Sequence, residues 1–209
     1  MSTTKKWIIA AVVMLVAGVL ICGITFANFG LDLHKLSTVE YETNTYEVKE
    51  DFRNITFKAD TEDITLIPSS DDTCKVVCLE EKDDPHQVSV QGDTLTICRK
   101  EKQKIQFFNI GIITESPKIE VYLPNDKYQA LSVDADTSDV NIPKDFTFES
   151  ISVTLDTGDI ECQACAITDV SMKTDTGRIT ISEISASEMK LTSDTGRMDI
   201  KNVELSGDL

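Results

Sequence analysis

Four copies of one short pattern end this chain, and their spacing limits the folds that it can adopt. Set in register, they read LSVDADTSDVNI, ISVTLDTGDIEC, VSMKTDTGRITI and MKLTSDTGRMDI. Their central aspartates, Asp136, Asp156, Asp175 and Asp194, are 20, 19 and 19 residues apart. A fixed period of this length is typical of solenoids, in which each repeat forms one coil and neighbouring coils stack.

Each copy alternates apolar and polar residues with period two, which predicts strands that point one set of side chains into a core. A tight turn after each Asp-Thr pair joins a longer strand to a shorter one, and a return segment closes the coil. We therefore expect an all-β fold, a single-stranded β-solenoid with coils of about 19 residues, stacked about 4.8 Å apart. The expected core columns are Leu131, Ile151, Val170, Met189; Val133, Val153, Met172, Leu191; Val140, Ile160, Ile179, Met198; Ile142, Cys162, Ile181, Ile200; Phe146, Cys165, Ile184, Val203; and Phe148, Ile167, Ala186, Leu205.

The triplet Asp-Thr-Gly also carries the catalytic carboxylate of aspartic proteases. Such an enzyme brings two loops together so that two carboxylates share a proton. Here stacking would place at least three aspartates in one line, and the residues after the triplets are Asp159, Arg178 and Arg197. We expect turns instead, because glycine accepts a positive φ and aspartate accepts hydrogen bonds from turn N–H groups. The predicted turn residues are Asp136, Thr137, Asp156, Gly158, Asp175, Gly177, Asp194 and Gly196, with Thr137, Thr157, Thr176 and Thr195 as a hydroxyl ladder.

The line of Asp156, Asp175 and Asp194 could instead hold calcium. The glycine-rich nonapeptide of calcium-binding β-helices is absent, however, and Arg178 and Arg197 would partly neutralise this edge. We therefore expect no metal ion and no other cofactor.

The six cysteines offer two further possibilities. Cys162-x-x-Cys165 has the spacing of a zinc site, but no second such pair accompanies it and the histidines at 34 and 86 are isolated. Cys78 and Cys98 are the most plausible disulfide pair, because both follow strand-like segments. Cys74 and Cys78 cannot pair on one strand, where they would lie about 13 Å apart.

An uncharged apolar run, Trp7–Phe26, precedes the strands. As an α-helix it would span about 30 Å, the thickness of a bilayer's hydrocarbon core. Lys5 and Lys6 precede it, which predicts an N-terminus in the cytoplasm and the remainder outside the cell. A cleaved signal peptide is the alternative. The expected organisation is a cytoplasmic N-terminus (1–6), a transmembrane signal anchor (7–27), a tether (28–44), an N-terminal β region (45–130) and the solenoid repeats (131–209).

Charge excludes one class of partner. All 36 acidic residues but only 18 of the 20 basic residues follow the apolar run, which gives the outer part a net charge of −18. Such a surface repels phosphate backbones, so nucleic acid is excluded. Anionic polymers would need a bridging cation, which favours a protein partner.

Residues 45–130 carry further strand patterns. Ile55–Ile67 resembles another repeat copy, and Val88–Cys98 predicts a hairpin around Gly92. The apolar stretch Ile105–Ile113 predicts either a strand or cap over the start of the solenoid or an exposed contact patch. The last copy is followed by VELSGDL without a polar cap, which indicates truncation, an unusual closure or pairing with another molecule, including a second copy of this chain.

The segment KIEVYLPNDKYQALSVDADTSDVNI, followed by the DTGDI and DTGRI copies, resembles the β-strand-repeat "putative adhesin" family of bacterial envelope proteins, common in low-GC Gram-positive bacteria. The resemblance covers about residues 46–209. It implies one N-terminal membrane helix followed by a β-solenoid outside the cell, and it carries over no catalytic residue. We therefore expect a membrane-anchored, outward-facing, non-catalytic binding or scaffold module whose partner is an envelope protein or a wall polymer.

Two other function classes stay open. The domain could be a spacer, an envelope-stress sensor or an accessory of a membrane partner, and it would then signal through the helix. It could also be a carbohydrate-active enzyme on a β-helix scaffold, although residues 131–209 contain no Trp or Tyr to form a sugar-binding platform.

Overall fold

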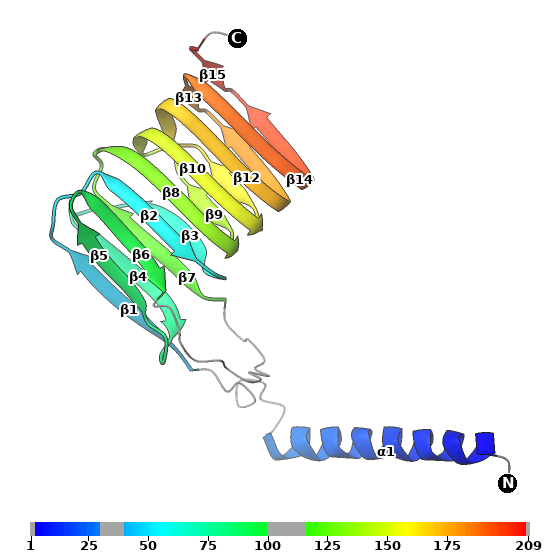
Figure 1. The fold of residues 1–209 in the computed structure, drawn as a ribbon. Coiled ribbons are helices and arrows are strands. Elements are labelled where there is room, and N and C mark those ends of the chain that lie inside the picture. Colours follow the sequence, from blue (N-terminus) through cyan, green and yellow to red (C-terminus); the bar gives the residue numbers. More distant parts are fainter. Residues whose placement is uncertain (1–2, 30–39, 100–115, 208–209) are drawn as a thin grey trace. The chain divides into compact units, whose positions relative to one another are not determined.

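The computed structural model describes residues 3–29, 40–99 and 116–207, and the chain divides into two units. The described part of the first unit is one helix, α1 (Thr3–Phe29), drawn in blue in Figure 1. Within it, Thr4–Thr25 is long and apolar enough to cross a membrane, a property that signal sequences share. The helix therefore contains the whole apolar run and extends beyond it at both ends.

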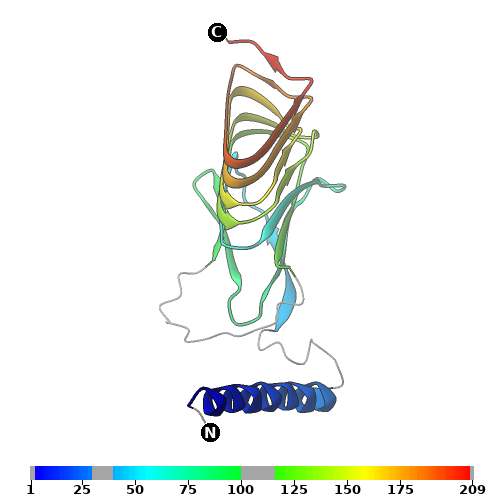
Figure 2. The same ribbon diagram turned by 90° about the vertical axis from the view of Figure 1, so that its right-hand side faces the viewer.

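The second unit is a β-solenoid, as the repeat predicts. Its strands form two walls that a tight turn joins in each repeat coil (Figures 1 and 2). The first wall consists, in spatial order, of β5 (His86–Gln91), β6 (Thr94–Arg99), β2 (Asn54–Ala59), β8 (Lys127–Thr137), β10 (Thr147–Thr157), β12 (Cys165–Ser182) and β14 (Glu188–Lys201). The second consists of β1 (Tyr41–Val48), β4 (Cys74–Glu81), β7 (Lys118–Leu123), β3 (Asp63–Pro68), β9 (Val140–Ile142) and β11 (Ile160–Cys162), and it continues through the later residues of β12 and β14. Two short strands of the return segments, β13 (Ser185–Ala186) and β15 (Glu204–Leu205), pair with each other.

Parallel pairing in register builds the core from the predicted columns. Ile151 pairs with Leu131 on one side and with Val170 on the other, and Val153 pairs with Val133 and Met172 in the same way. In the second wall, Ile160 pairs with Val140 and Ile179. Most of these side chains are less than 3% exposed, because the alternation of each strand points them between the walls. The first four predicted columns are therefore confirmed in register, but in the last coil Met198 and Ile200 are 38% and 52% exposed and do not belong to the core.

The return segment differs from the prediction by one residue. Thr147 pairs with Cys165 and Phe148 with Ala166, and the register then shifts at a bulge before Ser150. Buried Ala164 and Ala166 consequently lie level with Phe146 and Phe148, whereas Cys165 is only partly buried. The two predicted columns that placed Cys165 and Ile167 beside these phenylalanines are wrong, because the bulge adds one residue to β12. Phe146 and Phe148 pack on Tyr128 with ring centroids 6.5 and 5.6 Å apart.

The N-terminal copy forms a genuine coil. Strands β2 and β3 stack on β8 and β9, with Ile55 level with Leu131 and Ile64 level with Val140. Beyond this coil, antiparallel strands replace the repeat: β5 and β6 form the predicted hairpin, and β4 pairs with β1 and β7. Strand β1 begins inside the segment expected to be a tether, and the apolar stretch Ile105–Ile113 lies outside the described residues.

The predicted disulfide is absent, since Cys78 and Cys98 are both free thiols. Cys78 is buried on β4. On β6, the buried residues are Leu95 and Ile97, so the alternation turns Cys98 to the outer side of the wall. Two cysteines on opposite sides of their strands, which do not pair with each other, cannot meet the geometry of a bridge.

Candidate functional site

The repeat turns stack directly on one another. The residues that follow each Asp-Thr pair form one column of Glu62, Ser138, Gly158, Gly177 and Gly196. The three glycines have φ values of 132°, 152° and 155°. A Cβ on Gly177 would lie 2.0 Å from the carbonyl oxygen of Gly158. Glycine is therefore needed both for the backbone conformation and for the close approach of the neighbouring coil.

A ladder of aspartates fastens the turns, but it is not formed by the aspartates of the triplets. Asp63 Oδ1 accepts the backbone N–H of Asp139 at 3.0 Å, and Asp139 Oδ1 accepts that of Asp159 at 2.8 Å. Asp159 Oδ1 accepts the N–H of Arg178 at 2.7 Å. The aspartate two residues after each threonine therefore makes the contacts that were expected of the aspartate before it. The threonines themselves stack in register, with Thr157 level with Thr137 and Thr176.

The aspartates proposed for calcium, Asp156, Asp175 and Asp194, follow one another along adjacent coils at the outer surface. Asp175 forms an ion pair with Lys173 on the same strand, at 2.6 Å. Within the described residues, these three carboxylates do not form a group compact enough to share one ion. The expectation of no metal ion at this edge, with calcium as its alternative, stays a prediction.

A second group of polar side chains lies inside the solenoid near its N-terminal end, and no sequence pattern predicted it. Glu62 in the β2–β3 turn, Glu80 on β4 and His86 at the start of β5 are each at most 3% exposed. The side chain of Arg99, the last residue of β6, is 17% exposed. We call these four residues the buried polar cluster.

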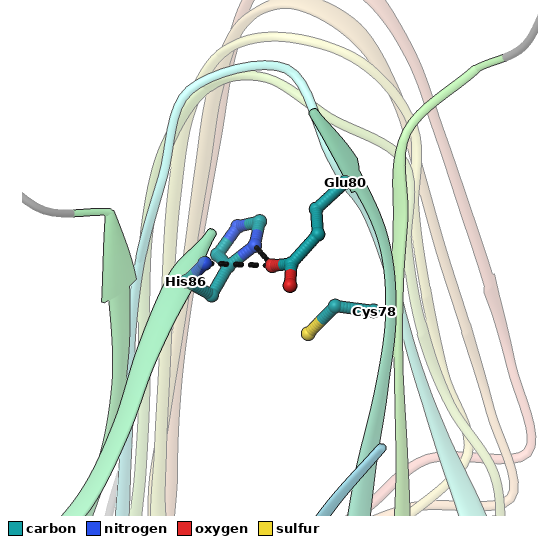
Figure 3. Close-up of side chains that lie close together, drawn as sticks. All are labelled: Cys78, Glu80 and His86. Atoms are coloured by element: carbon teal, nitrogen blue, oxygen red, sulfur yellow. Dashed lines mark hydrogen bonds and ion pairs between the residues drawn. The ribbon is translucent and has the colours of Figure 1, made fainter. Parts of the chain in front are cut away.

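The imidazole of His86 lies between two carboxylates. Its Nδ1 is 2.5 Å from Glu80 Oε2, and that oxygen also accepts the backbone N–H of His86 at 2.6 Å. Its Nε2 is 3.5 Å from Glu62 Oε1. Figure 3 shows the ring facing Glu80, with the sulfur of Cys78 beside the same carboxylate.

The remaining oxygen of Glu80 is held by a neighbouring strand, and that of Glu62 by its own turn. Glu80 Oε1 accepts hydrogen bonds from Asn44 Nδ2 and Tyr46 Oη, both at 2.7 Å, which ties β1 to the cluster. Glu62 Oε2 accepts the backbone N–H groups of Asp60 at 2.9 Å and Thr61 at 3.1 Å. Both carboxylates are therefore fixed in position by groups other than the histidine.

Arg99 supplies positive charge on the solvent side of the cluster. Its Nη2 lies 2.5 Å from Glu62 Oε1, and its Nη1 lies 3.5 Å from Asp84 Oδ2. The contact with Glu62 connects the hairpin β5–β6 with the first coil, and the contact with Asp84 connects it with the β4–β5 connection.

These contacts set the protonation of the cluster. Burial alone would raise the pKa of Glu62, but the interaction with His86, the charge of Arg99 and the N–H of Asp60 lower it to about 2. Burial opposes the charged form of His86, yet Glu62 and Glu80 raise its pKa above the ordinary value. Burial raises the pKa of the Cys78 thiol to about 12, helped by the charges of Glu80 and Glu62. These contacts favour the charged forms of the two carboxylates and of the imidazole, and burial favours the neutral thiol of Cys78 beside them.

Cys78, Glu80 and His86 are the one group in the described part of the chain whose ligand atoms all lie close enough to hold a metal ion, within 4.8 Å of one another. The sequence contained a signal for these residues. Glu80 continues the inward alternation of Cys74, Val76 and Cys78, and Arg99 continues that of Leu95 and Ile97. A charged residue in an inward register indicates a buried polar partner.

The profile of the Toastrack DUF4097 family matches residues 52–209 of the chain. The chain belongs to the Toastrack DUF4097 family. The β-solenoid expected from the repeat is therefore the Toastrack fold, and the match covers every repeat coil as well as the buried polar cluster. The expected link to low-GC Gram-positive bacteria stays a prediction.

Solved structures resemble this Toastrack chain at low sequence identity. A "putative cell adhesion protein" from Clostridium sporogenes superposes with a TM-score of 0.58 at 10% identity, covering 78% of this chain and 99% of the other. A "putative adhesin" from Parabacteroides merdae gives a TM-score of 0.35 at 11% identity, covering 82% and 96%. No curated protein matches the chain. The first of these likenesses supports the fold.

Proposed function

We propose that this Toastrack chain is a membrane-anchored, outward-facing and non-catalytic binding module of the bacterial cell envelope. Helix α1 would anchor it, with Lys5 and Lys6 on the cytoplasmic side and the solenoid outside. The name of the Clostridium sporogenes structure, a "putative cell adhesion protein", supports the same class of function. The proposal goes beyond the fold, which by itself does not determine function.

One observation carries the proposal: at one position on the outer face of the first wall, three successive coils carry the same side chain, before Lys190 takes that position in the last coil. Ser132, Ser152 and Ser171 lie level on β8, β10 and β12, on the side of the wall opposite the buried columns. Further along the same strands, Thr137, Thr157 and Thr176 repeat in the same way. Small polar side chains at a spacing of about 4.8 Å form a regular surface suited to an extended partner, either a segment of an envelope protein or a wall polymer.

The negative net charge of the chain favours one class of partner over another. With a net charge of −16 for the whole chain, the solenoid would repel an anionic polymer unless divalent cations bridged them. A protein partner is therefore favoured, and a second copy of this chain is one such partner.

Site-specific photocrosslinking tests the proposal in the full-length, membrane-anchored chain. A photoreactive residue at Ser152 or Ser171 reports on the repeated face, and one at Ser70 serves as the control, because Ser70 is exposed in a bend away from that face. We expect crosslinked adducts from Ser152 and Ser171 in living cells, and none from Ser70. Adducts from Ser70 alone, or from no position, would contradict a binding role for this face.

Co-sedimentation with isolated cell walls, using the same chain in lipid vesicles, then distinguishes the two partners. Sedimentation that requires calcium would identify an anionic wall polymer, whereas protein adducts without sedimentation would identify an envelope protein. The single change Ser171→Arg should weaken either interaction at least about tenfold relative to Ser70→Arg, since it places a long charged side chain on the repeated face.

A further inference from the structure

We propose that Cys78, Glu80 and His86 form a binding site for a divalent transition-metal ion of the zinc class. This inference concerns the N-terminal end of the solenoid and does not depend on the proposed binding function of the repeated face. It rests on three observations of geometry: the ligand set, the outer contacts and the small movement that a metal ion would require.

The ligand set matches the chemistry of zinc. A thiolate, an imidazole nitrogen and a carboxylate oxygen are its usual protein ligands, and their potential ligand atoms here lie within 4.8 Å of one another. Calcium and magnesium prefer oxygen ligands, so a site containing sulfur discriminates against both. Three protein ligands would leave the fourth tetrahedral position to water.

The outer contacts that a metal site needs are already in place. Glu80 uses Oε1 for Asn44 and Tyr46, so Oε2 faces His86 and is available to a metal ion. If Nδ1 of His86 binds the metal, its other proton sits on Nε2, 3.5 Å from Glu62 Oε1. Within the described part of the chain, His86 Nε2 has no hydrogen-bond partner, and Glu62 Oε1 is in ion-pair contact with Arg99 Nη2. A carboxylate that accepts the second N–H of a ligating histidine is the usual outer partner in zinc sites.

A metal ion would require only a small movement of the ligand atoms. Two ligands that each lie about 2.0 Å from a tetrahedral ion are about 3.3 Å apart. The distance from His86 Nδ1 to Glu80 Oε2 would have to increase from 2.5 Å to that value. A rotation of the Glu80 carboxylate or a tilt of the imidazole toward Glu62 provides it, and the tilt also brings Nε2 into hydrogen-bond range of Glu62.

A bound metal ion would leave no uncompensated charge in the buried site. With metal, Cys78 is a thiolate, His86 a neutral imidazole bound through Nδ1, and Glu80 a carboxylate. The two positive charges of M²⁺ balance the thiolate and the carboxylate. An unbalanced charge in the interior would be costly.

Cobalt(II) is the probe for the experiment, because a thiolate ligand gives cobalt a charge-transfer absorption band in the near ultraviolet. Full-length protein in detergent, stripped of metal with EDTA, is titrated with Co²⁺ and then with Zn²⁺. We expect one equivalent of Co²⁺ to produce the band, an equal amount of Zn²⁺ to abolish it, and Mg²⁺ to have no effect. Metal should also raise Tm, since it binds the folded state.

Variants assign the ligands. Cys78→Ser should abolish the band, and Glu62→Gln should retain it while weakening Co²⁺ affinity about 10–100-fold. The matched control is Cys162→Ser, which removes another fully buried thiol, on β11, outside the cluster. This control should keep both the band and the affinity. It also tests the Cys162-x-x-Cys165 spacing as a rival site.

Two outcomes would overturn the proposal. The first is the absence of a charge-transfer band and of a Tm increase in folded wild-type protein, which would leave the buried polar cluster as an ion-pair network only. The second is a band that survives in Cys78→Ser but disappears in Cys162→Ser. The first result is read on wild-type protein, and in the second the surviving band itself shows that Cys78→Ser still binds the metal.

Discussion

The carbonyl oxygen of Gly158 lies 2.0 Å from the point where a Cβ on Gly177 would be. The same relationship links Gly196 to Gly177, at 1.7 Å. Each of these two turns therefore approaches the preceding one so closely that only a hydrogen atom fits between them. This one contact, between the Cα of a glycine and the carbonyl oxygen of the preceding turn, explains both the tight stacking and the need for glycine.

Gly177→Ala should lower the free energy of unfolding by roughly 1–3 kcal/mol, through strain at a positive φ and displacement of the neighbouring turn. Denaturant unfolding followed by circular dichroism measures the change. Gly92→Ala is the matched control, because Gly92 also has a positive φ, 64°, but nothing lies within 4 Å of its Cβ position. Equal losses in the two variants would contradict a steric role for the turn contact.

Asp159→Ala should cost about 0.5–1.5 kcal/mol of stability, because it removes the acceptor of the 2.7 Å bond from the N–H of Arg178. Asp156→Ala, three residues earlier at an exposed position of the same turn, should change stability by less than about 0.5 kcal/mol. Thermal unfolding of the two variants compares them directly. The reverse order would return the structural role to the aspartate of the triplet.

The bulge in β12 can be tested by enlarging neighbouring residues. Ala166→Leu should destabilise the fold by about 1–3 kcal/mol, since Ala166 is 2% exposed against the return segment of β10. Cys165→Leu should be close to neutral, because Cys165 is only partly buried. If Cys165→Leu were the more damaging change, the register drawn from the sequence would be correct and the bulge wrong.

The stability of metal-free protein should fall at low pH because of Glu62. Its pKa is about 2 in the folded state and near 4.5 in the unfolded state, so its contribution is complete above about pH 4.5. That contribution, on the order of 2–3 kcal/mol, is lost as pH falls from about 4.5 toward 2. Glu62→Gln should be less stable at neutral pH and should lose less stability across this window. Parallel stability curves for the two proteins would contradict the assignment.

Exchanging Trp7–Phe26 for an unrelated apolar helix of equal length separates a binding module from a helix-coupled sensor. A binding module needs only an anchor, so the crosslinked adducts from Ser152 should persist after the exchange. Their loss, with the protein still inserted in the membrane, would favour the sensor that the sequence left open.

The repeat coils were predictable because one physical rule acts on every copy. Period-two alternation puts Leu131, Ile151 and Val170 in one column, and a constant spacing puts their turns in register. The return segment was not predictable, because a single extra residue before Asp169 shifts Cys165 out of the column without changing the apolar pattern. A bulge of this kind follows from the packing of neighbouring coils, which one copy alone does not reveal.

The buried polar cluster was missed for a different reason. Its members belong to the β2–β3 turn, β4, β5 and β6, which share no repeat, and only the fold brings Glu62 within reach of His86. The sequence nevertheless placed Glu62 in the column that holds glycine in later coils. A charged residue at a position where the other copies carry no side chain, or only a small one, was the available signal.

Parallel stacking in register makes the coil, rather than the residue, the unit by which this wall can change length. A gain or loss of one 19-residue copy would extend or shorten the first wall by about 4.8 Å and leave every other side chain in its own column. The antiparallel strands and the polar cluster at the start would be unaffected. Proteins built in this way can therefore differ in the length of the solenoid by whole coils, while the polar cluster at its N-terminal end is kept.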